Sequence, residues 1–308
     1  MPRRPGNLEQ LAELAVHTSA RERVAVARCA DAFVLQAGIQ AYESGLAEPV
    51  FIGNIEATRA RADECGLDIS RFELIPAADD EAAVSRAIDL HEAGEAGLIM
   101  KGLVSTATLL KELLSRAGKA GTRGVVSHVA VFDSPMDGRL MLMTDAGVNI
   151  APNLQRKVDI LKNALGVARA LGFEQPRTAL LAATEKVNFP AMPATLDADL
   201  ISKMGARGEF GDALVHGPLS LDLAVSKQSA ECKAVDHPVA GHADVLVLPD
   251  IESANVLYKS LTVLSRSPMA GVVVGTGVPV VVPSRGDTDR NKFFSLALAA
   301  YLAARKTE

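Results

Sequence analysis

The chain has 308 residues, of which 48% are hydrophobic and 22% charged, and its formal net charge at pH 7 is −5. This composition excludes disordered and collagen-like proteins. The acidic balance argues against a nucleic-acid binder, which would gather lysine and arginine on one surface. Because no apolar run is long enough to span a bilayer and the first residues are polar, we expect a cytoplasmic protein that does not bind membranes.

Cysteine and histidine give no pattern of metal ligands. Cys29, Cys65 and Cys232 are isolated from one another, and the six histidines are scattered without ligand spacing. Isolated thiols are typical of a reducing compartment. We therefore expect no structural zinc, and we also predict that the protein uses no metal and no bound cofactor.

Short apolar runs alternate with amphipathic segments along the chain, which is the pattern of a buried parallel sheet covered by helices. The fold class is therefore α/β. In chain order, the predicted strands are Val24–Arg28, Val50–Ile52, Phe72–Ile75, Leu98–Lys101, Val125–Phe132, Leu140–Thr144, Thr178–Ala183, Ala213–Val215, Val245–Leu248, Val272–Val274 and Val278–Val282. The predicted helices, with apolar side chains three or four residues apart, are Asp31–Gly45, Ile55–Cys65, Asp80–His91, Thr106–Arg116, Asn153–Leu171 and Asp289–Ala304.

The first candidate site is a strand-to-helix junction that contains Lys101, Ser105 and Thr106. Ligands of open α/β sheets bind beyond the carboxyl ends of strands, and the free amides of a helix start can receive an anion. Burying a lysine at the end of an apolar strand is costly unless it meets a partner or a ligand. The structural alternative is that Ser105 or Thr106 only caps the helix.

A second junction follows the strand at Val278–Val282, which stops at Pro283 and opens into Ser284 and Arg285. Arginine can bind phosphate through two parallel hydrogen bonds, and a serine hydroxyl can donate to an oxygen that becomes negative during acyl transfer. The alternative is a capped helix start with Arg285 in a surface ion pair.

Polar residues also follow two strands in the middle of the chain. Asp145 and Asn149 follow one strand, whereas Asp250, Asn255 and Lys259 follow the other, with the last two on one helical face. A tight turn would explain the first pair, and a solvated helix face would explain Lys259. A further loop carries His216, either as a base or as a partly buried imidazole.

Taken together, these segments resemble the phosphate acetyltransferase and phosphate butyryltransferase family from about Leu98 onward. The resemblance rests on MKGLVSTATLLKELL, VVSHVAVFDSP, LMLMTDAGVNIAPNLQRKVDIL, KVNFPAMPAT, GPLSLDLAVS, HPVAGHADVLVLPDIESANVLYK and GVVVGTGVPVVVPSRGDT. It implies an enzyme that reversibly transfers a short acyl group, acetyl to butyryl, between coenzyme A and inorganic phosphate. It also implies a homodimer that needs no metal.

The same resemblance implies two α/β domains with an active-site cleft between them, similar to isocitrate and isopropylmalate dehydrogenases. We place residues 1–131 and 272–308 in one domain and residues 132–271 in the other.

The resemblance also assigns roles to residues. Ser284 and Arg285 occupy the places of a serine–arginine pair that contributes to catalysis and phosphate binding. The expected substrate-binding residues are Lys101, Ser105, Thr106, Ser127, His128, Asp145, Asn149, Asp250, Asn255 and Lys259.

The chain departs from the family pattern at three positions. Acetyltransferase members have an aspartate, proposed as the base for the coenzyme A thiol, where this chain has Asn291. An amide cannot accept that proton, so Asp287 or Asp289 substitutes, or another group or solvent removes it. His216 and Ala254 replace an aspartate and a glycine, respectively.

Three rival functions differ in chemistry. An acyltransferase of the same fold could use acyl carrier protein, but it should then carry a basic docking face. An NAD-dependent decarboxylating dehydrogenase would need metal-binding aspartates in DxxxD-type spacing. Neither Asp197 with Asp199 nor Asp287 with Asp289 supplies it. A non-catalytic sensor of acyl phosphate or coenzyme A would explain the amide at Asn291.

Overall fold

The computed structural model describes residues 4–18, 22–119, 124–284 and 286–305. The chain forms two compact units. One, here called the N-terminal unit, comprises Leu8–Val126 and Pro268–Glu308, and the other, the central unit, comprises Met1–Asn7 and Ser127–Ser267. The borders predicted from the sequence, after residues 131 and 271, fall inside the strands β5 (Ser127–Asp133) and β10 (Met269–Val274). In the structure, the border between the units lies just before each of these strands.

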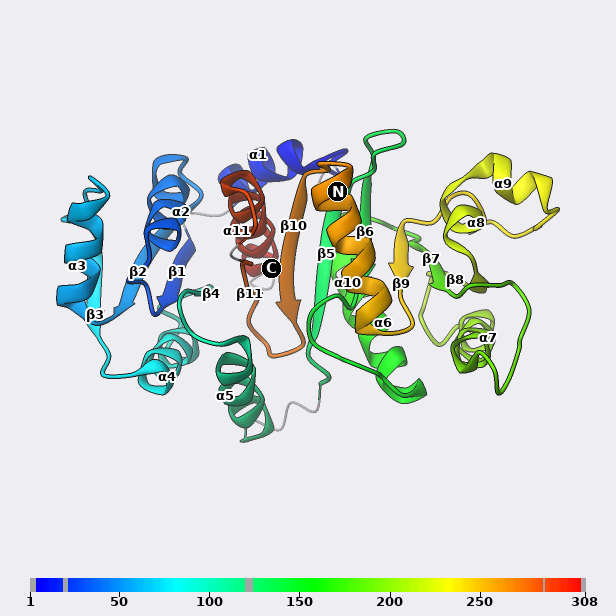
Figure 1. The fold of residues 1–308 in the computed structure, drawn as a ribbon, viewed down its shortest axis with the longest axis horizontal. Coiled ribbons are helices and arrows are strands. Elements are labelled where there is room, and N and C mark those ends of the chain that lie inside the picture. Colours follow the sequence, from blue (N-terminus) through cyan, green and yellow to red (C-terminus); the bar gives the residue numbers. More distant parts are fainter. Residues whose placement is uncertain (1–3, 19–21, 120–123, 285, 306–308) are drawn as a thin grey trace. The chain divides into compact units, whose positions relative to one another are not determined.

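The N-terminal unit is built on a mostly parallel sheet with strand order β3-β2-β1-β4-β11-β10 (Figure 1). β1, β2, β3, β4 and β11 run parallel, and β10 is antiparallel to β11. The strands not yet bounded are β1 (Glu22–Ala27), β2 (Ala47–Gly53), β3 (Glu73–Pro76), β4 (Leu98–Lys101) and β11 (Val280–Val281). Its helices are α1 (Leu8–Thr18), α2 (Ala32–Glu43), α3 (Ile55–Glu64), α4 (Asp80–Glu92), α5 (Thr106–Lys119) and α11 (Asp289–Ala304).

The strand order reverses at β1. The chain proceeds from β1 outward to β2 and β3 and then returns to β4 on the other side of β1. At such a switch point the helices that follow neighbouring strands leave on opposite sides, so a crevice opens beyond the strand ends. The fold therefore directs attention to the loops after β1, β4 and β11.

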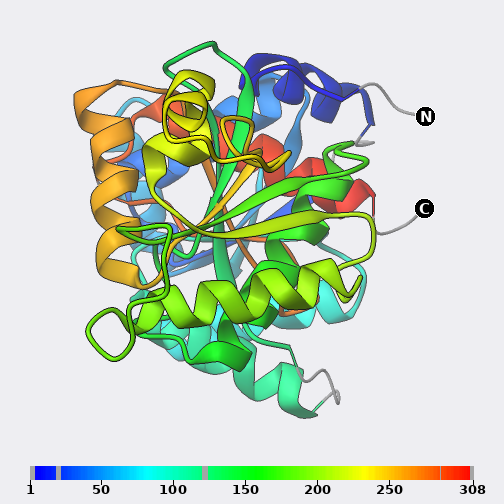
Figure 2. The same ribbon diagram turned by 90° about the vertical axis from the view of Figure 1, so that its right-hand side faces the viewer.

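The central unit has strand order β5-β6-β9-β7-β8, with β5 antiparallel to β6 and the other pairs parallel. In Figure 2, α7 lies on one side of β7 and β8, and α8 and α9 lie on the other. The strands not yet bounded are β6 (Leu140–Thr144), β7 (Arg177–Leu181), β8 (Leu214–Leu219) and β9 (Val245–Val247). The helices are α6 (Leu154–Ala170), α7 (Pro193–Ala206), α8 (Leu221–Val225), α9 (Lys227–Cys232) and α10 (Ile251–Lys259), which continues into a π-helical turn at Ser260–Leu264.

Every strand and helix expected from the sequence corresponds to one in the structure, and the α/β fold class is confirmed. Buried apolar strands explain the success, since β4, β6 and β9 are withdrawn from solvent along almost their whole length. The helices α1, α7, α8, α9 and α10 were not among the expected helices. α8 and α9 have only five and six residues, too short to show a helical repeat.

Candidate active site

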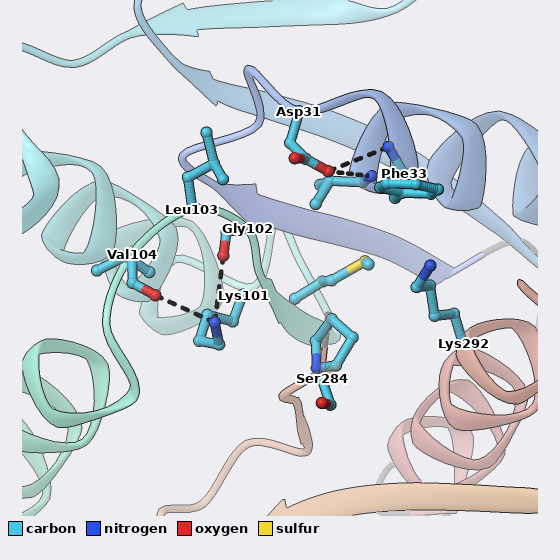
Figure 3. A pocket seen from close by; sticks show the side chains of 11 residues that line it. Asp31, Phe33, Lys101, Gly102, Leu103, Val104, Ser284 and Lys292 are labelled. Atoms are coloured by element: carbon cyan, nitrogen blue, oxygen red, sulfur yellow. Dashed lines mark hydrogen bonds between the residues drawn. The ribbon is translucent and has the colours of Figure 1, made fainter. Parts of the chain in front are cut away.

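A cavity of about 290 Å³ lies in the N-terminal unit, where β4 and β11 end and α2 and α11 begin (Figure 3). Its wall mixes apolar and charged side chains: Asp31, Phe33, Val34, Met100, Lys101, Gly102, Leu103, Val104, Pro283, Ser284 and Lys292. The residues come from both chain segments of the unit. The cavity therefore occupies the position that the reversal of strand order favours for a ligand.

Lys101 is the last residue of β4 and lines this cavity, partly exposed. Its Nζ donates hydrogen bonds to the carbonyl oxygens of Gly102, at 3.3 Å, and Val104, at 3.1 Å. These contacts hold the ammonium against the loop that follows the strand. The lysine that the sequence singled out as costly is thus positioned by carbonyl groups at the wall of a cavity.

Gly102 allows that loop to lie directly on the end of β1. Its amide donates to Ala27 O, and the amide of Leu103 donates to Arg28 O, both at 2.8 Å. A Cβ atom at Gly102 would lie only 2.2 Å from Arg28 O and 2.7 Å from Ala27 O. Only glycine fits between these backbones without a shift.

Ser284 also lines the cavity, immediately after the Pro283 that ends the β11 segment. Its amide donates to Asp287 Oδ2 at 2.7 Å, and its Oγ accepts from the amide of Gly286 at 3.4 Å. Asp287 is therefore bonded to the backbone of the predicted catalytic serine. Arg285 lies outside the described residues.

Lys292 was not predicted, although it is the second lysine of the cavity. Its side chain is 6% exposed; Nζ lies 3.2 Å from Asp289 Oδ1 and 4.6 Å from the ring centre of Phe33. Asp289 and Phe33 are both more than half exposed, at 55% and 58%. Asp289, one of the two aspartates expected to replace the missing base, thus pairs with a lysine.

The burial of Lys292 is only partly offset by these contacts. Removing an ammonium from water costs several kcal/mol. An ion pair with an exposed carboxylate contributes at most about 1 kcal/mol, and a cation–π contact with an exposed ring about 0.5–1 kcal/mol. The same cost argument that marked Lys101 could have found Lys292, because this lysine precedes two phenylalanines and the long apolar part of its helix.

Asp31 and Phe33 are the other polar and aromatic residues of the wall that sequence reasoning missed. Asp31 caps α2, with Oδ1 accepting from the amides of Phe33 and Val34 at 3.0 and 3.2 Å. An aspartate before an apolar helix is a common capping signal, so the pattern alone did not distinguish it from a site residue.

Ser105 and Thr106 lie at the start of α5 and are not part of the cavity wall. The hydroxyl of Ser105 accepts from the amide of Thr108 at 3.0 Å and lies 2.8 Å from the Thr108 hydroxyl. This is the geometry of a helix cap. Ser105 therefore caps α5, which is the structural alternative that the sequence left open.

The other predicted binding residues gather at one edge of the central unit's sheet. β5 is antiparallel to β6, and β6 is parallel to β9, so the start of β5 lies beside the ends of β6 and β9. That edge carries Ser127, His128, Asp145, Asn149, Asp250, Asn255 and Lys259.

Asp145 and Asn149 organise the loop after β6. The buried carboxylate of Asp145 accepts from the amides of Gly147, Val148 and Asn149, at 3.0–3.1 Å, and from Asn149 Nδ2 at 2.6 Å. A carboxylate with four such donors has little capacity left for a ligand. Asp145 therefore stabilises the loop after β6, which agrees with the alternative that these residues form a tight turn.

Asp250 and Asn255 connect α10 to its surroundings. Asp250 caps the helix, with Oδ1 accepting from the amide and the hydroxyl of Ser253 at 2.8 and 2.7 Å. Asn255 Nδ2 donates to Ala146 O at 3.3 Å, which joins the helix to the loop after β6.

Ser127, His128 and Lys259 complete this edge. Buried Ser127 accepts a hydrogen bond from Asn163 Nδ2 at 2.9 Å. The His128 ring packs edge-on against Tyr258 at 6.0 Å, and Lys259 Nζ lies 5.2 Å from the same tyrosine ring. Asn255 is exposed, whereas His128 and Lys259 are half-buried.

The three departures from the family pattern have structural contacts. Asn291 is buried and its Oδ1 accepts from the amide of Met269, at 3.2 Å, which joins α11 to β10. His216 stacks on His237 at 3.8 Å, and burial, with the charge of His237 second, lowers the pKa of His216 to about 4. Ala254 is fully buried in α10.

Two findings concern the described residues as a whole. Within these ranges, no three or more histidine, cysteine, aspartate or glutamate side chains are grouped closely enough to hold a metal ion. None of the helices in this part of the chain combines the length and the apolar character needed to cross a bilayer.

Similar proteins share this fold and sequence. The chain is 40% identical to the phosphate butyryltransferase of Clostridium acetobutylicum, over 94% of this chain and 96% of that one. It is 37% identical to the phosphate acetyltransferase of Rhizobium meliloti, over 99% and 96%. The crystal structure of a branched-chain phosphotransacylase from Enterococcus faecalis V583 superimposes with a TM-score of 0.79 at 34% identity, covering 92% of this chain and 99% of that one.

These relatives are acyltransferases, so the fold and the sequence together define an enzyme of that class. The family model described as phosphate acetyl/butaryl transferase matches residues 81–300. The chain belongs to this phosphate acetyltransferase and butyryltransferase family, which confirms the resemblance found in the sequence. Solved 4-hydroxythreonine-4-phosphate dehydrogenases, at 15–16% identity and TM-scores of 0.56–0.57, share the fold alone and support the expected dehydrogenase-like architecture.

Proposed function

We propose that the protein transfers a short acyl group, acetyl to butyryl, reversibly between coenzyme A and inorganic phosphate. Acyl-CoA and phosphate give acyl phosphate and coenzyme A, with the acyl carbon exchanging its bond to sulfur for a bond to oxygen. Family membership carries the proposal. The cavity that contains Lys101 and Ser284 supports it, because a cation and a hydroxyl suit an anionic, oxygen-rich substrate.

In the direction of thioester formation, the coenzyme A thiolate attacks the carbonyl carbon of the acyl phosphate, and phosphate leaves. Ser284 and a backbone amide stabilise the oxyanion, while Arg285 holds the departing phosphate. No covalent enzyme intermediate is needed. Orienting two anionic reactants in one site can lower the barrier by about 7–11 kcal/mol.

For the base that accepts the thiol proton we favour Asp287 over Asp289. The Asp287 carboxylate accepts from the backbone of Ser284 at 2.7 Å, whereas Asp289 pairs with Lys292. In the central unit, we assign substrate contacts to His128, Asn255 and Lys259. Ser127, Asp145, Asn149 and Asp250 then act by fixing the loops that carry these contacts, and Ser105 and Thr106 act by starting α5.

We also propose that the enzyme is a cytoplasmic homodimer that requires no metal or bound cofactor. The three separate cysteines support the compartment. Exposed apolar side chains of the central unit support the dimer: Val256, Val263 and Leu264, on and just beyond α10, are 67%, 66% and 80% exposed.

A substrate series tests the activity. Acetyl-, propionyl-, butyryl- and branched acyl-CoA are each mixed with phosphate, and release of the free thiol is followed. We expect turnover with at least one of them in the absence of carrier protein and added metal. No thiol release with any member, but tight binding of coenzyme A, would instead support a sensor, and activity only with acylated carrier protein would support the carrier-dependent enzyme.

Replacing Arg285 tests the phosphate-binding assignment. Arg285→Ala should raise the KM for phosphate and lower kcat, together by about 100-fold in kcat/KM, because charged hydrogen bonds to phosphate are worth about 1.5–3 kcal/mol each. Arg169→Ala, which removes an arginine that donates to the Phe210 carbonyl in the central unit, is the control. Unchanged kinetics in Arg285→Ala would remove this residue from the site.

A further inference from the structure

The cavity of the N-terminal unit is lined by two lysines that come from different elements. Figure 3 shows Lys101 at the end of β4, with its nitrogen directed at the carbonyls of Gly102 and Val104, and Lys292 on the first turn of α11, with Ser284 drawn between them. Among the described residues that line the wall, Asp31 supplies the one carboxylate, and it accepts two amide hydrogen bonds from the start of α2. Asp31, and Asp289 beside Lys292, offset the charges of the two lysines, but both carboxylates already accept hydrogen bonds from the protein, so the ammonium groups remain the donors that face the cavity.

The two lysines are held in different ways. Lys101 is anchored by the carbonyl oxygens of Gly102 and Val104. Lys292 is almost wholly buried, and its contacts within the described ranges are one exposed carboxylate and one exposed ring, those of Asp289 and Phe33. An ammonium has three protons to donate. A further hydrogen-bond acceptor in the cavity would offset the part of the desolvation cost of Lys292 that Asp289 and Phe33 do not offset.

We propose that Lys292 binds a phosphate group of a substrate, together with Lys101 and Ser284, in this cavity. Lysine binds phosphate as a point charge, and Lys292 can donate further protons beyond its hydrogen bond to Asp289. This assignment rests on the proposed function and adds to it a binding residue on α11. The phosphate group belongs either to orthophosphate and acyl phosphate or to coenzyme A, and kinetics distinguish these sources.

The main test is Lys292→Met, which keeps the apolar stem and removes the charge. We expect the KM for the bound substrate to rise by about 10- to 100-fold, the range for losing a charged hydrogen bond, with a smaller change in kcat. A rise confined to phosphate identifies orthophosphate as the ligand, and a rise confined to coenzyme A identifies its phosphates. Lys292→Arg, which keeps the positive charge, should restore most of the affinity.

Arg290→Met is the matched control. Arg290 lies in the same turn of α11 but is exposed and pairs with Glu9 instead of lining the cavity. Removing its charge changes the net charge of the turn equally, so a long-range electrostatic effect would appear in both variants. We expect kinetic constants of Arg290→Met within twofold of those of the parent protein.

Ligand protection gives a readout that does not require turnover. Orthophosphate or coenzyme A should raise the melting temperature of the parent protein and of Arg290→Met, and it should raise that of Lys292→Met much less. If the parent protein proves inactive but is still protected, the proposed function fails and the binding assignment stands.

The assignment of Lys292 is overturned if both KM values and both protection shifts are the same in Lys292→Met and the parent. It is also overturned if neither ligand protects the parent protein. Should the methionine variant fail to fold, Lys292→Gln, which keeps a polar end without charge, is measured in the same way against the same expectations.

Discussion

At the scale of single residues, the cost of burying a charged side chain is offset in different ways at different positions. Lys292 is almost wholly and Lys101 partly withdrawn from water beside a cavity, whereas Asp145 is buried in a loop that supplies it with four donors. The sequence showed that such residues need partners. It could not show which would find them within the protein, because that depends on side-chain contacts made after folding.

The stacked imidazoles of His216 and His237 predict an acid sensitivity. Burial, and secondly the charge of His237, lower the pKa of His216 from 6.5 to about 4. Between these values the unfolded chain binds a proton that the folded protein does not, so the free energy of unfolding falls as the pH drops from 6.5 to 4. After allowance for partial exposure, we expect a loss of about 1–2 kcal/mol.

Urea unfolding at several pH values between 7 and 4 measures this effect. His216→Gln should show a shallower loss of stability across that window than the parent protein. His17→Gln, which changes an exposed histidine at the end of α1, should retain the parent slope. Equal slopes in all three proteins would show that His216 does not control the acid response.

At the scale of elements, the buried strands were predictable because apolar runs between glycine and polar segments leave few alternatives. Lys101 and Ser284 were predictable in the same way, as the residues that follow such runs. Phe33 and Lys292 lie in helices whose patterns are explained by packing and capping, so the burial cost of the lysine was the one signal that the sequence offered for them. Only the arrangement of β4, β11, α2 and α11 reveals that they share a cavity.

The contact between Gly102 and the end of β1 predicts a specific intolerance. In Gly102→Ala, a Cβ atom would lie 2.2 Å from a backbone oxygen that cannot rotate away. We expect a loss of about 1–3 kcal/mol in the free energy of unfolding, the usual cost of overpacking, and weaker phosphate binding because Lys101 is the preceding residue.

Thermal unfolding and the KM for phosphate measure these two effects. Gly166→Ala is the matched control, since Gly166 is exposed within α6 and a methyl group at this position would point into open space. That change should stabilise the protein by about 0.5–1 kcal/mol. A Gly102→Ala variant as stable as the parent would contradict the close approach.

At the scale of the whole molecule, family and fold class followed from the sequence because many ordered motifs and buried strands agreed. Charge and composition also limited the possible ligands. The unit borders depend on contacts between distant segments. The sequence therefore predicted the borders only by resemblance. In the structure, β5 lies entirely within the central unit and β10 entirely within the N-terminal unit.

The proposed dimer predicts a change in mass when the exposed apolar surface beyond α10 is charged. Val263→Glu with Leu264→Glu should shift sedimentation from twice the chain mass to the chain mass, because unpaired carboxylates are costly at an interface. Met136→Glu, which charges another exposed apolar side chain of the central unit, is the control. A monomeric parent protein would refute the dimer, and a double variant that stays dimeric would place the interface elsewhere.

The pairing of β11 with β4 has a consequence for how the protein is made. Val280 lies opposite Ile99, which precedes it by 181 positions. During synthesis β1 to β4 leave the ribosome before β11 is made, so β4 lacks this neighbouring strand while residues 127–267 of the central unit are synthesised. A chain truncated before α11 would therefore lack Lys292, and with it the proposed phosphate-binding site.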